Sequence, residues 1–198
     1  MRNMTNVRTH WLEFLRGSKP LILVALLAFL HASGVKAARF DRIYVFGDSY
    51  SDTGAGYVDG NGPTAVAYLA ERLGISLLPS NDPNGRGKGL NFAVSGAGTG
   101  SGPGRKVKDA LLGLGMRNQV EDFAVRVRSH AIEFDPETTL FFLAGGLNDK
   151  SLPSETTVQN LKSAIKILYG LGGRRFRVAV LPTEILLSVR WDNGSIPS

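Results

Sequence analysis

Three short polar segments of this 198-residue chain contain residue types that could do chemistry. Residues 47–54 read GDSYSDTG, and Ser49 there is a candidate nucleophile whose own backbone N–H could point at a substrate oxygen. Residues 95–104 read SGAGTGSGPG, and residues 145–149 read GGLND. Asn148, in the last segment, has an uncharged amide that could donate a hydrogen bond to an oxyanion, and this amide does not need a particular protonation state to do so.

Each segment also has a purely structural interpretation. Asp48, Ser49 and Asp52 could cap a following helix, because Ser and Asp often do so. Asn148 could form an Asx turn between a strand and a helix. These alternatives remain open when each segment is considered alone.

The glycine-rich segment at 95–104 could cradle a phosphate, since Arg105, Lys106 and Lys108 follow it closely. It contains neither a Gly-Lys-Ser/Thr sequence nor a G-x-G-x-x-G pattern, so the signal for nucleotide binding is weak. A mobile surface loop with solvated lysines explains the segment equally well.

The elements that must position these segments alternate between apolar runs and helical patterns, which predicts a parallel sheet covered by helices on both faces. Each polar segment begins where an expected strand ends, and ligands of such sheets bind beyond the carboxyl ends of the strands. The expected strands are 42–46, 90–94, 139–144 and 177–181, and the expected helices are 64–73, 158–168 and one whose apolar face runs from Met116 to Phe134.

In this order and spacing, the three segments resemble the blocks of the GDSL, or SGNH, family of serine esterases and lipases. The resemblance makes Ser49 the nucleophile, with Tyr50 where leucine is common. Residues 91–97 resemble the second block, with Gly96 as the oxyanion glycine, and residues 146–149 resemble the G-x-N-D block, with Asn148 as the side-chain donor. Residues 40–46 are similar to the exported branch that includes phospholipases, haemolysins and autotransporter esterases.

The resemblance implies a flavodoxin-like three-layer α/β/α sandwich with a parallel sheet. It also implies hydrolysis of a small-molecule or lipid acyl ester through an acyl-enzyme on Ser49, with no metal and no organic cofactor. The family spans lipids, short acyl esters, thioesters and acetylated sugars, and no motif here selects among them.

The family's last block, D-x-x-H, has no counterpart in this sequence. Asp192 is followed by Asn193, Gly194 and Ser195, and His130 falls on the expected helix at 116–134, where a structural role is more common. A serine hydroxyl is a poor nucleophile without a neighbouring base, so we expect weak or absent activity. The simplest account is a reading frame truncated or frameshifted after Pro182, with the C-terminal part of the fold missing.

Two other interpretations of the sequence, from different functional classes, compete with an ester hydrolase. One is a secreted, non-catalytic binding module, in which Ser49, Gly96 and Asn148 form a pocket for an anion or acyl group. The other is a nucleotide-binding domain that uses the glycine-rich segment.

The N-terminus has the parts of a secretory signal peptide: basic residues before position 20, the apolar run 21–30 and small residues up to Ala37. We therefore expect a signal peptide at 1–37, a hydrolase domain at 38–198 and a secreted or periplasmic product. The apolar run is shorter than the roughly 20 residues that span a bilayer, but an uncleaved membrane anchor is the alternative. Membrane contact is expected only through this segment or a lipid substrate.

Composition supports a single globular domain, with 43% hydrophobic and 20% charged residues. The absence of cysteine excludes disulfides, thiolate zinc sites and a cysteine nucleophile, and with only three histidines we expect no His-rich metal site. The net charge of +6 comes mostly from the N-terminus, because 18 basic residues face 16 acidic ones from Ala38 onward. We therefore expect no nucleic-acid partner. No pattern specifies the oligomeric state.

Overall fold

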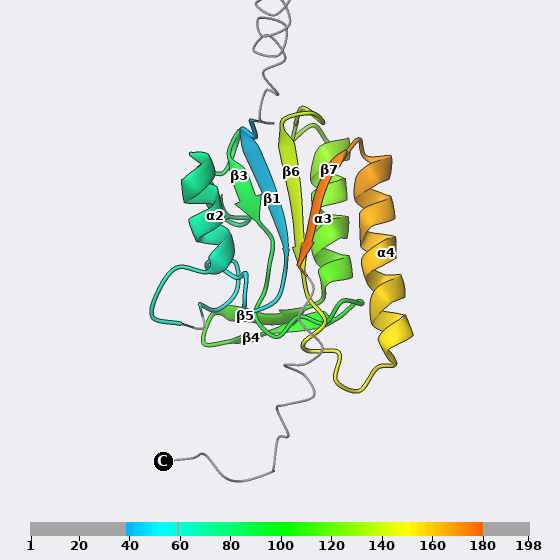
Figure 1. Cartoon of the computed structure of the whole chain (residues 1–198). Helices are drawn as coiled ribbons and strands as arrows, with labels where there is room; N and C mark the ends of the chain where they lie inside the picture. The colour runs from blue at the N-terminus through cyan, green and yellow to red at the C-terminus, as the bar shows by residue number, and fades with distance from the viewer. Residues whose placement is uncertain (1–38, 59, 180–198) are drawn as a thin grey trace, which may run out of the picture. The chain divides into compact units, whose positions relative to one another are not determined.

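The fold is built on a five-stranded parallel sheet, seen in a computed structural model that describes residues 39–58 and 60–179 (Figure 1). Its strand order is β2-β3-β1-β6-β7, so the first strand lies at the centre. The strands are β1 (Arg42–Gly47), β2 (Leu77–Pro79), β3 (Gly89–Asn91), β6 (Thr139–Ala144) and β7 (Arg175–Ala179).

Helices cover both faces of this sheet. Side chains alternate between faces along β1: Ile43 and Val45 pack with α2 (Ala65–Leu73), whereas Tyr44 and Phe46 face α3 (Met116–Arg128) and α4 (Ser154–Gly170). The expected three-layer α/β/α architecture is therefore confirmed. Within the described residues, no helix is both long enough and apolar enough to cross a membrane.

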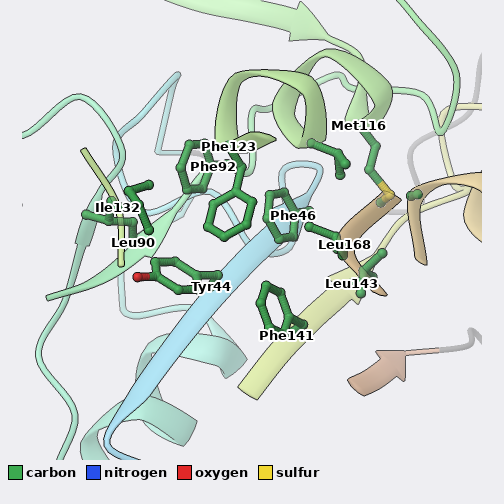
Figure 2. Close-up of a cluster of buried hydrophobic side chains, with 12 residues drawn as sticks. Tyr44, Phe46, Leu90, Phe92, Met116, Phe123, Ile132, Phe141, Leu143 and Leu168 are labelled. Atoms are coloured by element: carbon green, nitrogen blue, oxygen red, sulfur yellow. The ribbon is translucent and has the colours of Figure 1, made fainter. Parts of the chain in front are cut away.

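A cluster of aromatic rings fixes α3 against the sheet (Figure 2). The Phe123 ring lies 4.8 Å from that of Tyr44, 5.6 Å from Phe46 and 5.8 Å from Phe141, measured between centroids. Rings in such tilted and edge-to-face arrangements add to the free energy of burial. The cluster thereby holds the N-terminus of α3 at the end of the sheet where the strands terminate.

Helix α3 is shorter than its apolar periodicity predicts, and the prediction that it contains His130 is wrong. The helix ends at Arg128, and His130 follows with a φ of +58°. Ile132 and Phe134 nevertheless pack into the same core, because the chain folds back after the helix. Their spacing reflects a shared core rather than continued helix.

A two-stranded antiparallel hairpin, β4 (Pro103–Val107) and β5 (Ala110–Leu114), follows the glycine-rich segment. The interpretation of residues 95–104 as a loop is wrong at the end of this segment, where Pro103 and Gly104 begin β4. The turn consists of Lys108 and Asp109, with φ values of +49° and +70°. Asn and Gly are the usual residues for such a turn, so residue types gave no hairpin signal.

The other expected elements differ from the structure mainly at their ends. The predicted helix at 64–73 is α2, with Thr64 accepting a hydrogen bond from the Ala67 N–H and Gly74 closing the helix in the left-handed region. Strand β3 ends at Asn91 rather than at 94, and β2 was not predicted. The expected signal peptide, Asp192 and the end of the strand at 177–181 lie outside the described residues.

Candidate active site

The three polar segments that the sequence singled out lie on adjoining loops at one end of the sheet. Gly47 is in register with Ala144 at the ends of β1 and β6, and the Val94 N–H donates to the Gly47 carbonyl at 3.1 Å. The strand arrows in Figure 1 end on this side, and the β4–β5 hairpin lies across it. The strand ends therefore place the loops of Ser49, Gly96 and Asn148 next to one another.

Ser49 lies in a tight turn directly after β1. The Ser51 and Asp52 N–H groups both donate to the Asp48 carbonyl at 3.0 Å, and the Tyr50 N–H donates to Asp48 Oδ1 at 3.1 Å. Ser49 itself is half-buried, and its N–H donates to no other described residue. The turn thus leaves both the hydroxyl and the N–H of Ser49 available to a ligand.

The start of this turn is held by Gln119, a fully buried residue in the first part of α3. Its side-chain Oε1 accepts from the Gly47 N–H at 2.9 Å, and Nε2 donates to the carbonyls of Gly47 at 2.8 Å and Leu114 at 2.9 Å. The amide therefore joins the end of β1 to α3 and to the end of β5.

Asp52 joins the serine loop to the glycine loop. Its carboxylate is fully buried and accepts four backbone N–H groups: Gly54 at 2.9 Å, Gly56 at 3.2 Å, Tyr57 at 3.0 Å and Ser95 at 2.8 Å. Several N–H donors can compensate a buried carboxylate for its lost water. The last of these bonds fixes the backbone immediately before Gly96.

Gly96 needs to be glycine because its φ is +81°. A β-carbon there would also lie 3.4 Å from the Gly113 backbone nitrogen of β5. The residue is exposed, and its N–H donates to no described group. A backbone donor is thus presented beside the loop of Ser49.

The loop after β6 is tied to the glycine loop by two neighbouring side chains. Asn148 Nδ2 donates to the Ala97 carbonyl at 2.9 Å, which leaves its second amide hydrogen without a described acceptor. Asp149 is buried and accepts from the Thr99 N–H at 2.9 Å, from the Thr99 hydroxyl, and from the Thr157 hydroxyl at 2.7 Å. These bonds orient Asn148 toward the loop of Gly96.

The glycine-rich segment is not arranged as a free phosphate cradle. Its N–H groups at Ala97, Thr99 and Gly102 already donate to the Val94 carbonyl, Asp149 Oδ1 and Asn118 Oδ1. The basic residues at 105, 106 and 108 lie on the hairpin rather than around the loop. No described group of three His, Asp or Glu side chains forms a metal site.

Burial is the main electrostatic influence on Asp48, next to the candidate nucleophile. It raises the pKa of the Asp48 carboxyl, and the nearby charge of Asp149 acts in the same direction. The hydrogen bond from the Tyr50 N–H lowers the pKa and only partly offsets this effect.

His130 lies far from Ser49. Gln119 marks the end of α3 near Gly47, and the nine residues from there to Arg128 rise about 14 Å along the helix. The side chain of His130 is 83% exposed, with Nδ1 3.8 Å from a Glu133 carboxylate oxygen. It lines a separate pocket of about 270 Å³ beside Tyr44 and Arg126. The structure thus brings Ser49, Gly96 and Asn148 together and leaves the histidine at the opposite end.

Comparison with known proteins agrees with this arrangement. The family model described as GDSL-like Lipase/Acylhydrolase matches residues 43–188, about three quarters of the chain. The chain belongs to this family. A search of curated proteins finds no match. Membership in the GDSL-like lipase/acylhydrolase family makes the protein a hydrolase of the general esterase or lipase type, and it confirms the resemblance carried by the three loops.

Sequence reasoning missed some residues that position the GDSL loops. Gln119 carried a usable signal, because it is a polar residue at helical spacing from Met116 and Phe123, on the buried face of α3. Asn91 carried a weaker one at the end of β3: its Nδ2 donates to the Ser51 carbonyl at 2.5 Å and to Thr53 Oγ1 at 2.9 Å.

Proposed function

We propose that this protein hydrolyses carboxylic esters through an acyl-enzyme on Ser49, with low turnover. The observation that carries the proposal is the set of unused donors on three adjoining loops: the N–H groups of Ser49 and Gly96 and one amide hydrogen of Asn148. None of the three donates to another described residue.

These donors suit the charge that develops during acyl transfer. The Ser49 Oγ attacks the ester carbonyl carbon, and the carbonyl oxygen becomes an oxyanion held by Gly96 and Asn148. Collapse of this intermediate breaks the ester C–O bond and leaves the acyl group on Ser49; the proton lost by the Ser49 hydroxyl passes to the leaving alkoxide, which departs as the alcohol. Water then attacks the acyl-enzyme and releases the acid.

The proposed turnover is low because no described group serves as the base for Ser49. His130 is at the opposite end of the sheet, and the printed sequence contains no Asp-x-x-His. An oxyanion site and substrate binding alone retain about 10³- to 10⁴-fold acceleration over water. The same absence favours the second candidate function, a binding module that holds an acyl group or anion without cleaving it.

We propose further that the protein acts outside the cytoplasm, as a secreted or periplasmic enzyme. The basic N-terminus, the apolar run at 21–30 and the small residues before position 38 support this location. Mass measurement of the exported protein tests it, because cleavage at 37 removes the apolar run and an anchored product keeps it.

Hydrolysis of a short-chain p-nitrophenyl ester tests the function, measured for the wild type, Ser49→Ala and Ser101→Ala. Ser101 is an exposed serine of the glycine-rich loop and serves as the matched control. We expect slow hydrolysis that Ser49→Ala abolishes and Ser101→Ala retains, together with fluorophosphonate labelling at Ser49. Equal background rates in all three proteins, with no labelling, would overturn the proposed hydrolysis and favour the binding module.

A further inference from the structure

Exposed apolar and basic side chains gather around the loop of Ser49. We call this set the mouth patch: Tyr50, Tyr57, Val58, Arg105, Lys106, Val107 and Lys108. The four apolar members are between 43% and 65% exposed. Large apolar side chains with this much exposure, grouped at one site, indicate an interaction surface rather than scattered surface residues.

Backbone contacts bring the members of the patch together although they are distant in sequence. The Ser95 hydroxyl donates to the Tyr57 carbonyl at 2.5 Å, beside Gly96. A β-carbon at Gly56 would collide with the Leu111 carbonyl of β5, and Leu111 is paired with Lys106 across the hairpin. The loop at 56–58 therefore lies against the hairpin, and both adjoin the glycine loop (Figure 1).

The basic members of the patch have no partner among the described residues. No hydrogen bond or ion pair connects Arg105, Lys106 or Lys108 to another residue of the described ranges. Elsewhere in the described ranges, Arg117, Arg126 and Arg175 are paired with Glu121, Asp122 and Glu137. Arg128, Lys162 and Lys166 are unpaired within these ranges, as the basic residues of the patch are, but they lie on α3 and α4. The hairpin thus presents three cations and one acid, Asp109, in a domain whose charges nearly balance.

We propose that the mouth patch docks the protein on an anionic lipid bilayer, which presents lipid esters to Ser49. The proposal rests on the proposed function for the identity of the reacting residue. It goes further by naming the substrate class, esters held in a negatively charged lipid surface.

The chemistry of the patch matches that surface on two counts. Tyrosine rings are favoured at the headgroup level of a bilayer, where one end is apolar and the other is wet. Lysine and arginine close to an anionic leaflet are attracted by its surface potential, and this attraction falls with added salt. Tyr50 follows Ser49 directly, so contact at the patch brings the bilayer to the nucleophile.

A single labelled cysteine tests the docking in the full chain, because the protein has no cysteine of its own. Val107→Cys places an environment-sensitive fluorophore on the hairpin, and Val125→Cys places it on exposed α3 as the control. The probes are vesicles of phosphatidylcholine alone and vesicles with about one third phosphatidylglycerol. Both variants retain the N-terminal apolar run, so any membrane contact made through that run is common to both. The two variants differ only in which surface of the domain carries the fluorophore.

We expect the label at position 107 to shift to the blue with the anionic vesicles alone and to lose this response at about 0.5 M salt. The label at position 125 should not respond. Replacing Arg105, Lys106 and Lys108 by Gln should weaken the response about a hundredfold in lipid concentration. The matched triple variant, with Arg128, Lys162 and Lys166 replaced by Gln, should keep it.

Equal responses at positions 107 and 125, or no response at 107, would overturn the docking. The docking would also be overturned if the variant with Arg105, Lys106 and Lys108 replaced by Gln bound the anionic vesicles as tightly as the matched triple variant does. Hydrolysis of the soluble p-nitrophenyl ester, which the hairpin variant should retain, separates this failure from failure of the proposed function.

Discussion

Asp48 is the residue whose ionisation most directly affects the loop of the candidate nucleophile. Its carboxyl is buried, and only the Tyr50 N–H among the described donors from other residues contacts Oδ1. Asp52 and Asp149 are buried too, but several donors surround each of them. Burial with few donors explains why the pKa of Asp48 is raised.

A raised pKa predicts that Asp48 lowers the stability of the protein as the pH increases. Above the ordinary value of 3.8, the folded state holds its proton to higher pH than the unfolded state does. The free energy of unfolding therefore falls as the pH rises from 3.8 through the raised pKa. Asp48→Asn should remove this fall while keeping an oxygen for the Tyr50 N–H.

Urea unfolding at a series of pH values measures the effect. The difference in unfolding free energy between Asp48→Asn and the wild type should move in favour of the variant as the pH rises through this window. Asp41→Asn, which changes an exposed carboxyl just before β1, is the control. A constant difference across the window would contradict the prediction.

Among the elements, α3 does most to position the serine loop. Its Phe123 packs among the rings of the sheet, and its Gln119 bonds both backbone groups of Gly47. The N–H of Gly47 has no other acceptor among the described residues. Helix packing and loop geometry are therefore coupled through one side chain.

Gln119→Leu should destabilise the fold by about 1–3 kcal/mol, because it leaves the buried Gly47 N–H without an acceptor. It should also lower kcat for the p-nitrophenyl ester, since Ser49 follows two residues later. Gln159→Leu, at an exposed position of α4, is the matched control and should change neither quantity. Unchanged unfolding free energy in Gln119→Leu would show that Gly47 does not depend on this amide.

The same elements show how far the sequence predicts the structure. Strand β6 matches the expected range, and Thr64 and Gly74 mark the ends of α2 as expected, because local residue types determine these features.

The end of α3 was missed, since Ile132 and Phe134 return to the core from outside the helix. The hairpin was missed because Lys108 and Asp109 adopt positive φ without the usual residues. The family motifs located the loops, but the bonds of Asp52 and Gln119 depend on contacts between distant residues.

At the scale of the whole molecule, the two faces of the sheet differ in how completely helices cover them. Helices α3 and α4 and the aromatic cluster cover the face that includes Phe141, which is fully buried. On the other face α2 packs with Ile43 and Val45, and Phe142 of β6 is only partly buried at its margin. Along β7, Arg175, Arg177 and Ala179 are exposed. Among the described elements, then, one face is more thickly covered than the other.

Adjacent phenylalanines of β6 measure this asymmetry. Phe141→Ala should cost about 3–5 kcal/mol of unfolding free energy, because it empties a site among the rings of Tyr44, Phe123, Phe134 and Phe176. Phe142→Ala should cost about half as much or less, since its side chain loses less buried area. Both substitutions remove the same atoms from neighbouring positions of one strand, so differences in β propensity or in the unfolded chain largely cancel. Urea unfolding of the two variants gives the comparison, and equal costs would mean that the face bearing Phe142 is covered as fully as the other.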